Sequence, residues 1–142
     1  MEYRAILSIQ GQQIYSPNEE PEVTQLVTEA VMTLTEEEIT LRYEETELTG
    51  LEGTTTTFSI RPGFVTLLRQ GQVNSEMVFE QGRRHLSMYS TPYGTMSVGI
   101  NTRRMVIELD ETGGNLEIDY SLEINHAVAS ENIFSVFVKV KP

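Results

Sequence analysis

The 142-residue sequence contains no cysteine, no tryptophan and only two histidines. Without cysteine there is no disulfide, no thiol nucleophile and no thiolate metal site. No apolar run approaches the roughly 20 residues that a membrane-spanning helix needs. The sequence therefore predicts neither a disulfide-stabilised fold nor a membrane protein.

Motifs for chemistry are equally scarce. There is no Gly-x-Ser-x-Gly elbow, no Ser-x-x-Lys, no phosphate-binding loop and no metal-ligand spacing. The sequence thus gives no catalytic residue, metal site or cofactor, although scattered triads leave an enzyme open as a third hypothesis. The first residues alternate like a strand and show no signal-peptide pattern, which indicates a bacterial-type cytoplasmic protein.

Basic residues are few, ten against 21 acids, for a net charge of −11. Nucleic acid is not an expected partner, because phosphate binding needs clustered Lys and Arg. The charge is unevenly distributed: residues 17–60 carry a net −10, whereas residues 61–105 carry a net +4. A positive middle segment in an acidic chain is the one electrostatic irregularity.

What the chain does have is apolar alternation. The clearest case is 116–124, where Leu116, Ile118, Tyr120, Leu122 and Ile124 alternate with polar or charged residues. Successive side chains of a strand point to opposite faces, so this run predicts a strand with one face on a core or lumen. We expect strands at 3–10, 24–34, 38–45, 54–61, 64–70, 73–80, 84–90, 95–101, 103–110, 115–124 and 133–140.

Short turns rich in Gly, Pro and Asn separate these runs, which favours antiparallel neighbours and a sandwich or barrel formed by one domain over residues 1–142. Polar residues interrupt the pattern at 15–23 and 127–131, where we expect mobile segments. One segment is ambiguous. Apolar residues in 22–34 follow helical spacing, but β-branched residues favour a strand.

A family resemblance appears in five stretches that keep their order and spacing. They are LRYEE at 41–45, RQGQV at 69–73, FEQG at 79–82, YSTPYG at 89–94 and GNLEIDY at 114–120. Together they resemble the YwiB-like family of small bacterial proteins of unknown function. The resemblance implies an all-β, single antiparallel, largely up-and-down barrel of the calycin or lipocalin type, and it moves 22–34 to strand. It implies no activity.

The arginines of the positive segment are the best candidates for a site. A guanidinium suits a carboxylate or phosphate, and Arg69 also occupies the Arg-x-Gly position of the resembled family. We expect Arg69 to point inward near Tyr43 or Tyr89. Arg61 is a second candidate on the rim, and the alternative is that such arginines pair with the Glu-rich strand 38–45.

Tyr43, Tyr89 and Tyr120 each offer an apolar ring with a hydroxyl, a useful lining for a small cavity. His85 shares a strand face with Tyr89 and is a weaker candidate, since an ordinary strand histidine explains it as well. The acidic pairs, including Glu44 and Glu45, are expected to be solvated turn charge.

Three functions follow. Barrels of about eight strands are either filled by side chains or hold one small ligand. The sequence favours non-enzymatic binding of a small, anionic molecule within the barrel. The alternatives are a structural or protein-interaction module with a filled lumen and, third, a small enzyme. The oligomeric state is not predicted.

Overall fold

The computed structural model describes residues 1–15, 19–72, 74–91 and 93–142, with only the backbone described at 88–91. These residues form ten strands and no helix. The strands are β1 (Glu2–Ile14), β2 (Glu22–Leu34), β3 (Ile39–Glu44), β4 (Thr54–Arg61), β5 (Phe64–Gly71), β6 (Ser75–Glu80), β7 (Arg84–Thr91), β8 (Gly94–Asp110), β9 (Gly113–Ile124) and β10 (Ala127–Val140).

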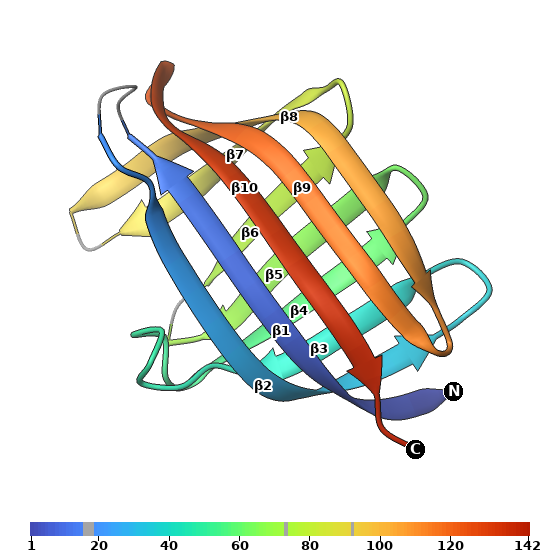
Figure 1. Ribbon diagram of the computed structural model, residues 1–142. Helices are drawn as coiled ribbons and strands as arrows, with labels where there is room; N and C mark the ends of the chain where they lie inside the picture. The colour runs from blue at the N-terminus through green and yellow to red at the C-terminus, as the bar shows by residue number, and fades with distance from the viewer. Residues whose placement is uncertain (16–18, 73, 92) are drawn as a thin grey trace.

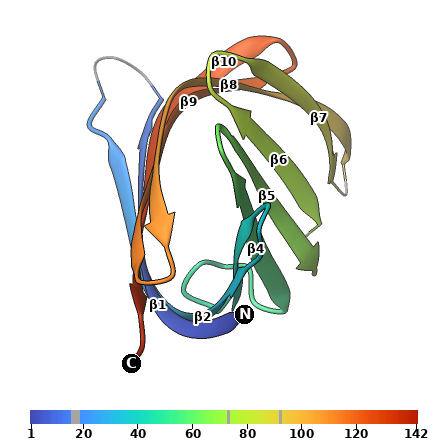
Figure 2. The same cartoon turned by 90° about the vertical axis from the view of Figure 1, so that its right-hand side faces the viewer.

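All ten strands belong to one antiparallel sheet with the order β6-β5-β4-β3-β2-β1-β10-β9-β8-β7. Strands that follow one another in sequence pair with each other, except that β6 and β7 form the two ends of the sheet; the first strand, β1, pairs with the last, β10 (Figure 1). The sheet curls until its two ends approach one another (Figure 2). There the turn between β6 and β7 meets β8: Gly82 N donates to Thr102 O at 2.9 Å, and Thr102 N donates to Arg83 O at 3.2 Å. The predicted all-β barrel is therefore confirmed as a nearly closed one.

The inner face of the sheet forms the core, as the alternation requires. In β9, Leu116 and Ile118 are fully buried, whereas Glu117 lies on the outer face beside Arg104. The core continues onto the inner faces of β1 and β10, with Leu7, Val136 and Val138. Burial of this one face is what closes the sheet around itself.

Two of the predicted boundaries were wrong. The runs 95–101 and 103–110 are one strand, β8, with a register shift between Thr102 and Arg104. Because of this bulge, Arg103 and Arg104 both lie on the outer face after the inward-facing Thr102, so the alternation skips one residue. Residues 127–131, expected to be mobile, belong to β10. Part of the other expected mobile segment, 16–18, lies outside the described residues.

Residues 22–34 form a strand, β2, despite their helical spacing. Leu26, Ala30 and Leu34 contribute to the core on the inner face, whereas Val27 points to the outer face. The pattern looked helical because apolar residues occupy both faces of this strand.

The wall of the barrel opens where β2 leaves β3. The two strands pair only over Val31–Leu34 and Ile39–Arg42, while β2 pairs with β1 from Glu22 to Thr33. Figure 2 shows the first half of β2 standing away from β3 and β4. The barrel is therefore wider at the end where β2 begins and β5 finishes. Within the part of the chain that the structure describes, there is also no helix long and apolar enough to cross a membrane.

Candidate ligand-binding site

A row of polar side chains crosses the inner wall near the wide end of the barrel. The strand register aligns Tyr43 of β3, Thr56 of β4, Arg69 of β5 and Ser75 of β6. Residues opposite one another in adjacent strands point to the same face. Because Tyr43 and Thr56 are buried in the core, Arg69 shares their inward direction.

The backbone after Arg69 explains how the end of β5 is held in place. Gly71 has φ +132°, and a Cβ there would lie 2.2 Å from the carbonyl oxygen of Gly53. Only glycine allows β5 and the chain before β4 to approach so closely. The tight approach fixes the last residues of β5 against β4.

Arg69 lines a cavity of about 410 Å³ between β5 and the far wall. Most of the lining is apolar, including Leu67, Met77, Phe79, Met96, Val98 and Leu122. Polar groups come from Gln13, Thr24, Arg69, Ser87, Tyr120 and Asn132. This size and composition, an apolar wall with a few polar groups, are typical of sites for small molecules.

The guanidinium of Arg69 lacks a partner at one of its donors. Its Nε is buried and has no hydrogen-bond acceptor among the described residues. Its positive charge acts on two tyrosines: burial raises the pKa of Tyr120 to about 12, and Arg69 opposes that rise. Burial, and then the charge of Glu45, raise the pKa of Tyr43, which Arg69 again lowers. Arg69 therefore lies within electrostatic reach of Tyr43 and Tyr120, as the sequence predicted for Tyr43.

Glu45 belongs to the same end of the lumen, although the sequence predicted a solvated charge. It is only 7% exposed, and its carboxylate accepts hydrogen bonds from Thr49 Oγ1 at 2.9 Å and from Thr56 Oγ1 at 3.2 Å. Glu44, one residue earlier, lies outside and accepts from Thr55 Oγ1 at 2.9 Å. The position of Glu45 on the inner side of a strand end was the signal that could have revealed it.

Two other candidates do not reach the cavity. Arg61 is at the opposite end of the barrel, where its side chain is 56% exposed and its Nε lies 3.5 Å from Glu38. This is the pairing with the 38–45 strand that was the alternative interpretation. His85 Nε2 lies 2.9 Å from Glu80 Oε1, and its ring meets Phe64 edge-on. The side chain of Tyr89 lies outside the described residues.

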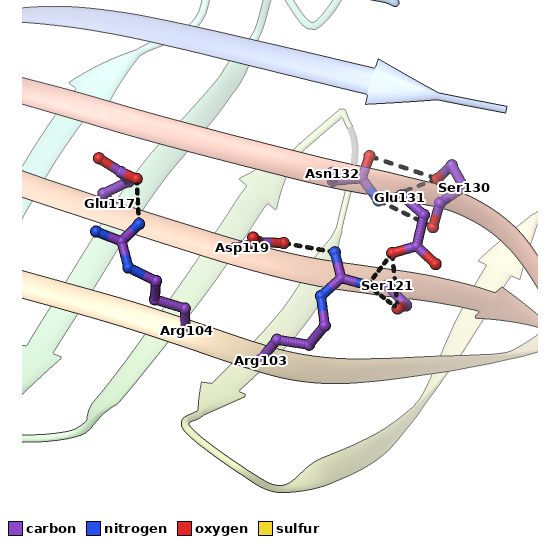
Figure 3. A network of polar contacts seen from close by, with 8 residues as sticks. All are labelled: Arg103, Arg104, Glu117, Asp119, Ser121, Ser130, Glu131 and Asn132. Atoms are coloured by element: carbon purple, nitrogen blue, oxygen red, sulfur yellow. Dashed lines mark hydrogen bonds and ion pairs between the residues drawn. The ribbon is translucent and has the colours of Figure 1, made fainter. Parts of the chain in front are cut away.

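Most of the remaining arginines hold the outer wall together. Figure 3 shows Arg103 at the bulge of β8, reaching Asp119 of β9 at 2.5 Å and Glu131 of β10. Arg104 reaches Glu117 at 2.6 Å. The pKa of Arg103 is raised because both carboxylates hydrogen-bond to it. The arginines of the positive segment that lie on the outer face are thus largely neutralised by ion pairs, whereas Arg69, from the same segment, faces the lumen.

Asn132 and Thr24 are cavity residues that sequence reasoning missed. Asn132 is buried at the start of β10, next to the segment expected to be mobile, and its Nδ2 donates to Ser130 Oγ at 3.0 Å. Thr24 is the third residue of β2, the strand whose type was ambiguous. Once these strands were assigned, the alternation of inward and outward side chains would have placed Asn132 and Thr24 on the inner face. No group of three or more His, Asp or Glu side chains suited to a metal ion occurs among the described residues.

Comparison with known proteins identifies the family. No curated protein matches the chain. A crystal structure of the ywiB protein from Bacillus subtilis superimposes with a TM-score of 0.79 and 17% identity, over 99% of this chain and 94% of that one. At this identity the likeness concerns the fold. A family model, the domain of unknown function DUF1934, matches residues 7–136. The chain therefore belongs to the DUF1934 family.

Proposed function

We propose that this protein binds one small amphipathic anion inside its calycin-like barrel, without transforming it. The observation that carries the proposal is the buried Nε of Arg69, which has no acceptor among the described residues and borders a cavity. A carboxylate or similar anion would supply the missing acceptor. Tyr120, on the same cavity, could donate its hydroxyl to that anion.

The energetics favour an anion over a neutral ligand. A buried donor of a charged group that lacks an acceptor carries a desolvation cost of about 1–3 kcal/mol or more. A charge-assisted hydrogen bond to a ligand removes that cost. Glu45 raises and Arg69 lowers the pKa of Tyr43, but no ion pair joins Glu45 to Arg69 in the structure as described.

The rest of the ligand should be apolar. Leu67, Met77 and Phe79 border the cavity on one wall, and Leu122 borders it on the other. Burying the chain or ring of a ligand against these side chains contributes about 25 cal/mol per Å² of apolar surface. The cavity speaks against the alternative of a filled lumen. Among its described lining residues there is no pair of acidic or histidine side chains that would favour an enzyme.

Matched titrations test this proposal. Octanoate and octanol differ in the head group, so calorimetry with both compares an anion with a neutral alcohol of the same chain. We expect octanoate to bind at a ratio of one to one and octanol to bind at least ten times more weakly. The Arg69→Met variant should bind octanoate about 10–100 times more weakly, because a charge-assisted hydrogen bond is worth about 1.5–3 kcal/mol.

Two controls locate the site. Arg83→Met removes an exposed arginine from the β6–β7 turn and should leave the affinity unchanged. Leu122→Trp should fill the cavity and abolish binding, whereas Leu86→Trp, on the outer face of β7, should not. Equal binding of octanoate and octanol, or undiminished binding to Arg69→Met, would contradict the proposal.

A further inference from the structure

Strand β2 has an unpaired edge over residues 22–30. One edge of β2 pairs with β1, but the other pairs with β3 only from Val31 onward. Among the described residues, no other strand is hydrogen-bonded to that second edge over 22–30. The backbone N–H and C=O groups of alternate residues in this stretch point toward that edge and have no neighbouring strand in the part of the chain that the structure describes, which makes the edge a template for another strand.

The outer side of this edge is also unusually apolar. Val23 is 54% and Val27 is 69% exposed, and the register places Phe137 of β10, another exposed residue, across Ser8 from Val27. Natural sheets protect free edges with charges, prolines or bulges. Here the middle of the edge, residues 23–28, contains no charged residue and no proline.

We propose that this edge is a homodimer interface, in which β2 of two copies pairs in antiparallel fashion about a two-fold axis at Leu26. In this register Leu26 faces its own equivalent, Thr24 faces Thr28, and Gln25 faces Val27. All nine residues of the free edge are used. Each copy then keeps its inner side chains on the inner side, because residues that face each other point the same way.

The acidic residues of the edge support this register. Glu22 faces Ala30 and Glu29 faces Val23, so no two carboxylates face each other. A shift by one residue would place Glu22 opposite Glu29 twice, once on each side of the axis. Like charges directly opposite one another destabilise a strand pair.

Charge complementarity at the ends of the pair identifies the occupant as a second copy. A pocket of about 360 Å³ opens where β2 leaves β3. Arg4, Arg42 and Lys141 line it together with Glu29 and Glu44, and Lys141 is paired with Glu29 at 2.5 Å. Arg42 has no ion pair among the described residues. The paired strand of the second copy would begin beside this pocket and bring Glu19, Glu20 and Glu22 with it. The acidic segment before β2 and Arg42, which lies beside the free edge and is unpaired among the described residues, thus complement one another across the two-fold axis.

The absence of cysteine makes this pairing directly testable. In the proposed register, position 25 of one copy lies opposite position 27 of the other, at a Cα separation of about 4.5–5.5 Å that a disulfide spans. We expect an equal mixture of Gln25→Cys and Val27→Cys protein to form a disulfide-linked dimer under mild oxidation. Either variant alone should link far less, because its own equivalent lies diagonally at about 7–8 Å.

Sedimentation equilibrium tests the charge contacts on the intact protein. We expect a dimer whose dissociation constant rises at least tenfold in Arg42→Glu, and whose affinity returns when Glu20→Arg is added. Arg83→Glu changes the net charge equally at a distant turn and should leave the dimer intact. A monomer at all concentrations, a dimer without the 25–27 disulfide, or equal weakening by Arg42→Glu and Arg83→Glu would overturn the proposal.

Discussion

Glu45 and Arg69, two charged residues at the wide end of the barrel, differ in how completely their side chains are hydrogen-bonded. Both carboxylate oxygens of Glu45 accept hydrogen bonds from threonines, whereas the buried Nε of Arg69 has no acceptor among the described residues. A protein that required Arg69 only for folding would be expected to provide an acceptor for this Nε. The unsatisfied donor therefore favours a role in binding.

The stability of an Arg69 variant separates these two roles. We expect Arg69→Met to raise the free energy of unfolding of the ligand-free protein by about 1–3 kcal/mol, because methionine removes a poorly satisfied charge and keeps much of the packing. Urea denaturation measures this change. A loss of stability of similar size would assign Arg69 a structural role.

Burial of tyrosines gives the protein a predictable alkaline limit. The pKa values of Tyr43 and Tyr120 are raised in the folded state, that of Tyr120 to about 12. Above the unfolded pKa of about 10, the unfolded chain loses these protons first. The stability should therefore be complete below about pH 10 and fall as the pH rises toward 12.

Tyrosinate absorbance follows this titration directly. We expect Tyr43 and Tyr120 to contribute tyrosinate absorbance only above the ordinary tyrosine pKa of about 10. Tyr120→Phe should remove one late ionisation and part of the loss of stability. A folded protein whose tyrosinate absorbance has no component above about pH 10 that is lost in Tyr120→Phe would contradict the burial of Tyr120.

At the scale of single elements, β9 shows how alternation alone specifies a strand. Ile118 is fully buried and Glu117 lies on the outer face, paired with Arg104. We expect Ile118→Lys to destabilise the protein by more than about 3 kcal/mol, because it buries a charge without a partner. Glu117→Gln should cost less than about 1 kcal/mol, as exposed ion pairs do. Similar losses in urea denaturation would mean that β9 is not one-sided.

The close approach of β5 and the chain before β4 depends on one glycine. We expect Gly71→Ala to cost about 2–3 kcal/mol in urea denaturation, because alanine would be strained at φ +132° and its Cβ would overlap the carbonyl oxygen of Gly53. Gly82→Ala is the matched control, with φ +76° and no atom within 4 Å of the added Cβ. It should cost only about 1 kcal/mol. Equal costs would show that the contact with Gly53 is unimportant.

Elements with regular alternation were predictable, and those that break it were not. The strand at 54–61 matches β4, whereas the bulge at Arg103 was predicted as a gap between two strands. A bulge keeps the hydrogen-bonded ladder while shifting the pattern by one residue, so sequence periodicity cannot distinguish it from a turn. The start of β10 was missed because its polar residues, Ser130 and Asn132, face the lumen.

At the scale of the whole molecule, the composition of the site depends on which strands face each other across the barrel, and the sequence does not specify this. The inward direction of Arg69 and its proximity to Tyr43 were predictable from the strand end and the family motif. The ion pairs of Arg61 with Glu38 and of His85 with Glu80 determine where those side chains lie, and they depend on the fold. The arginines at 103 and 104 likewise pair with acids from strands later in the chain. The net charge of residues 61–105 could not show which arginine faces the lumen and which arginines form ion pairs on the outer face.

The central claim is that the free Nε of Arg69 is the donor for an anionic ligand. Nitrogen-15 NMR of arginine Nε–H groups observes this donor directly, and loss of one signal in Arg69→Lys assigns it. We expect the Arg69 signal to shift on addition of octanoate and to remain unchanged with octanol, while the signals of Arg103 and Arg104 stay fixed in both titrations. An Arg69 signal that octanoate leaves unchanged, or shifts spread equally over the outer arginines, would contradict the claim.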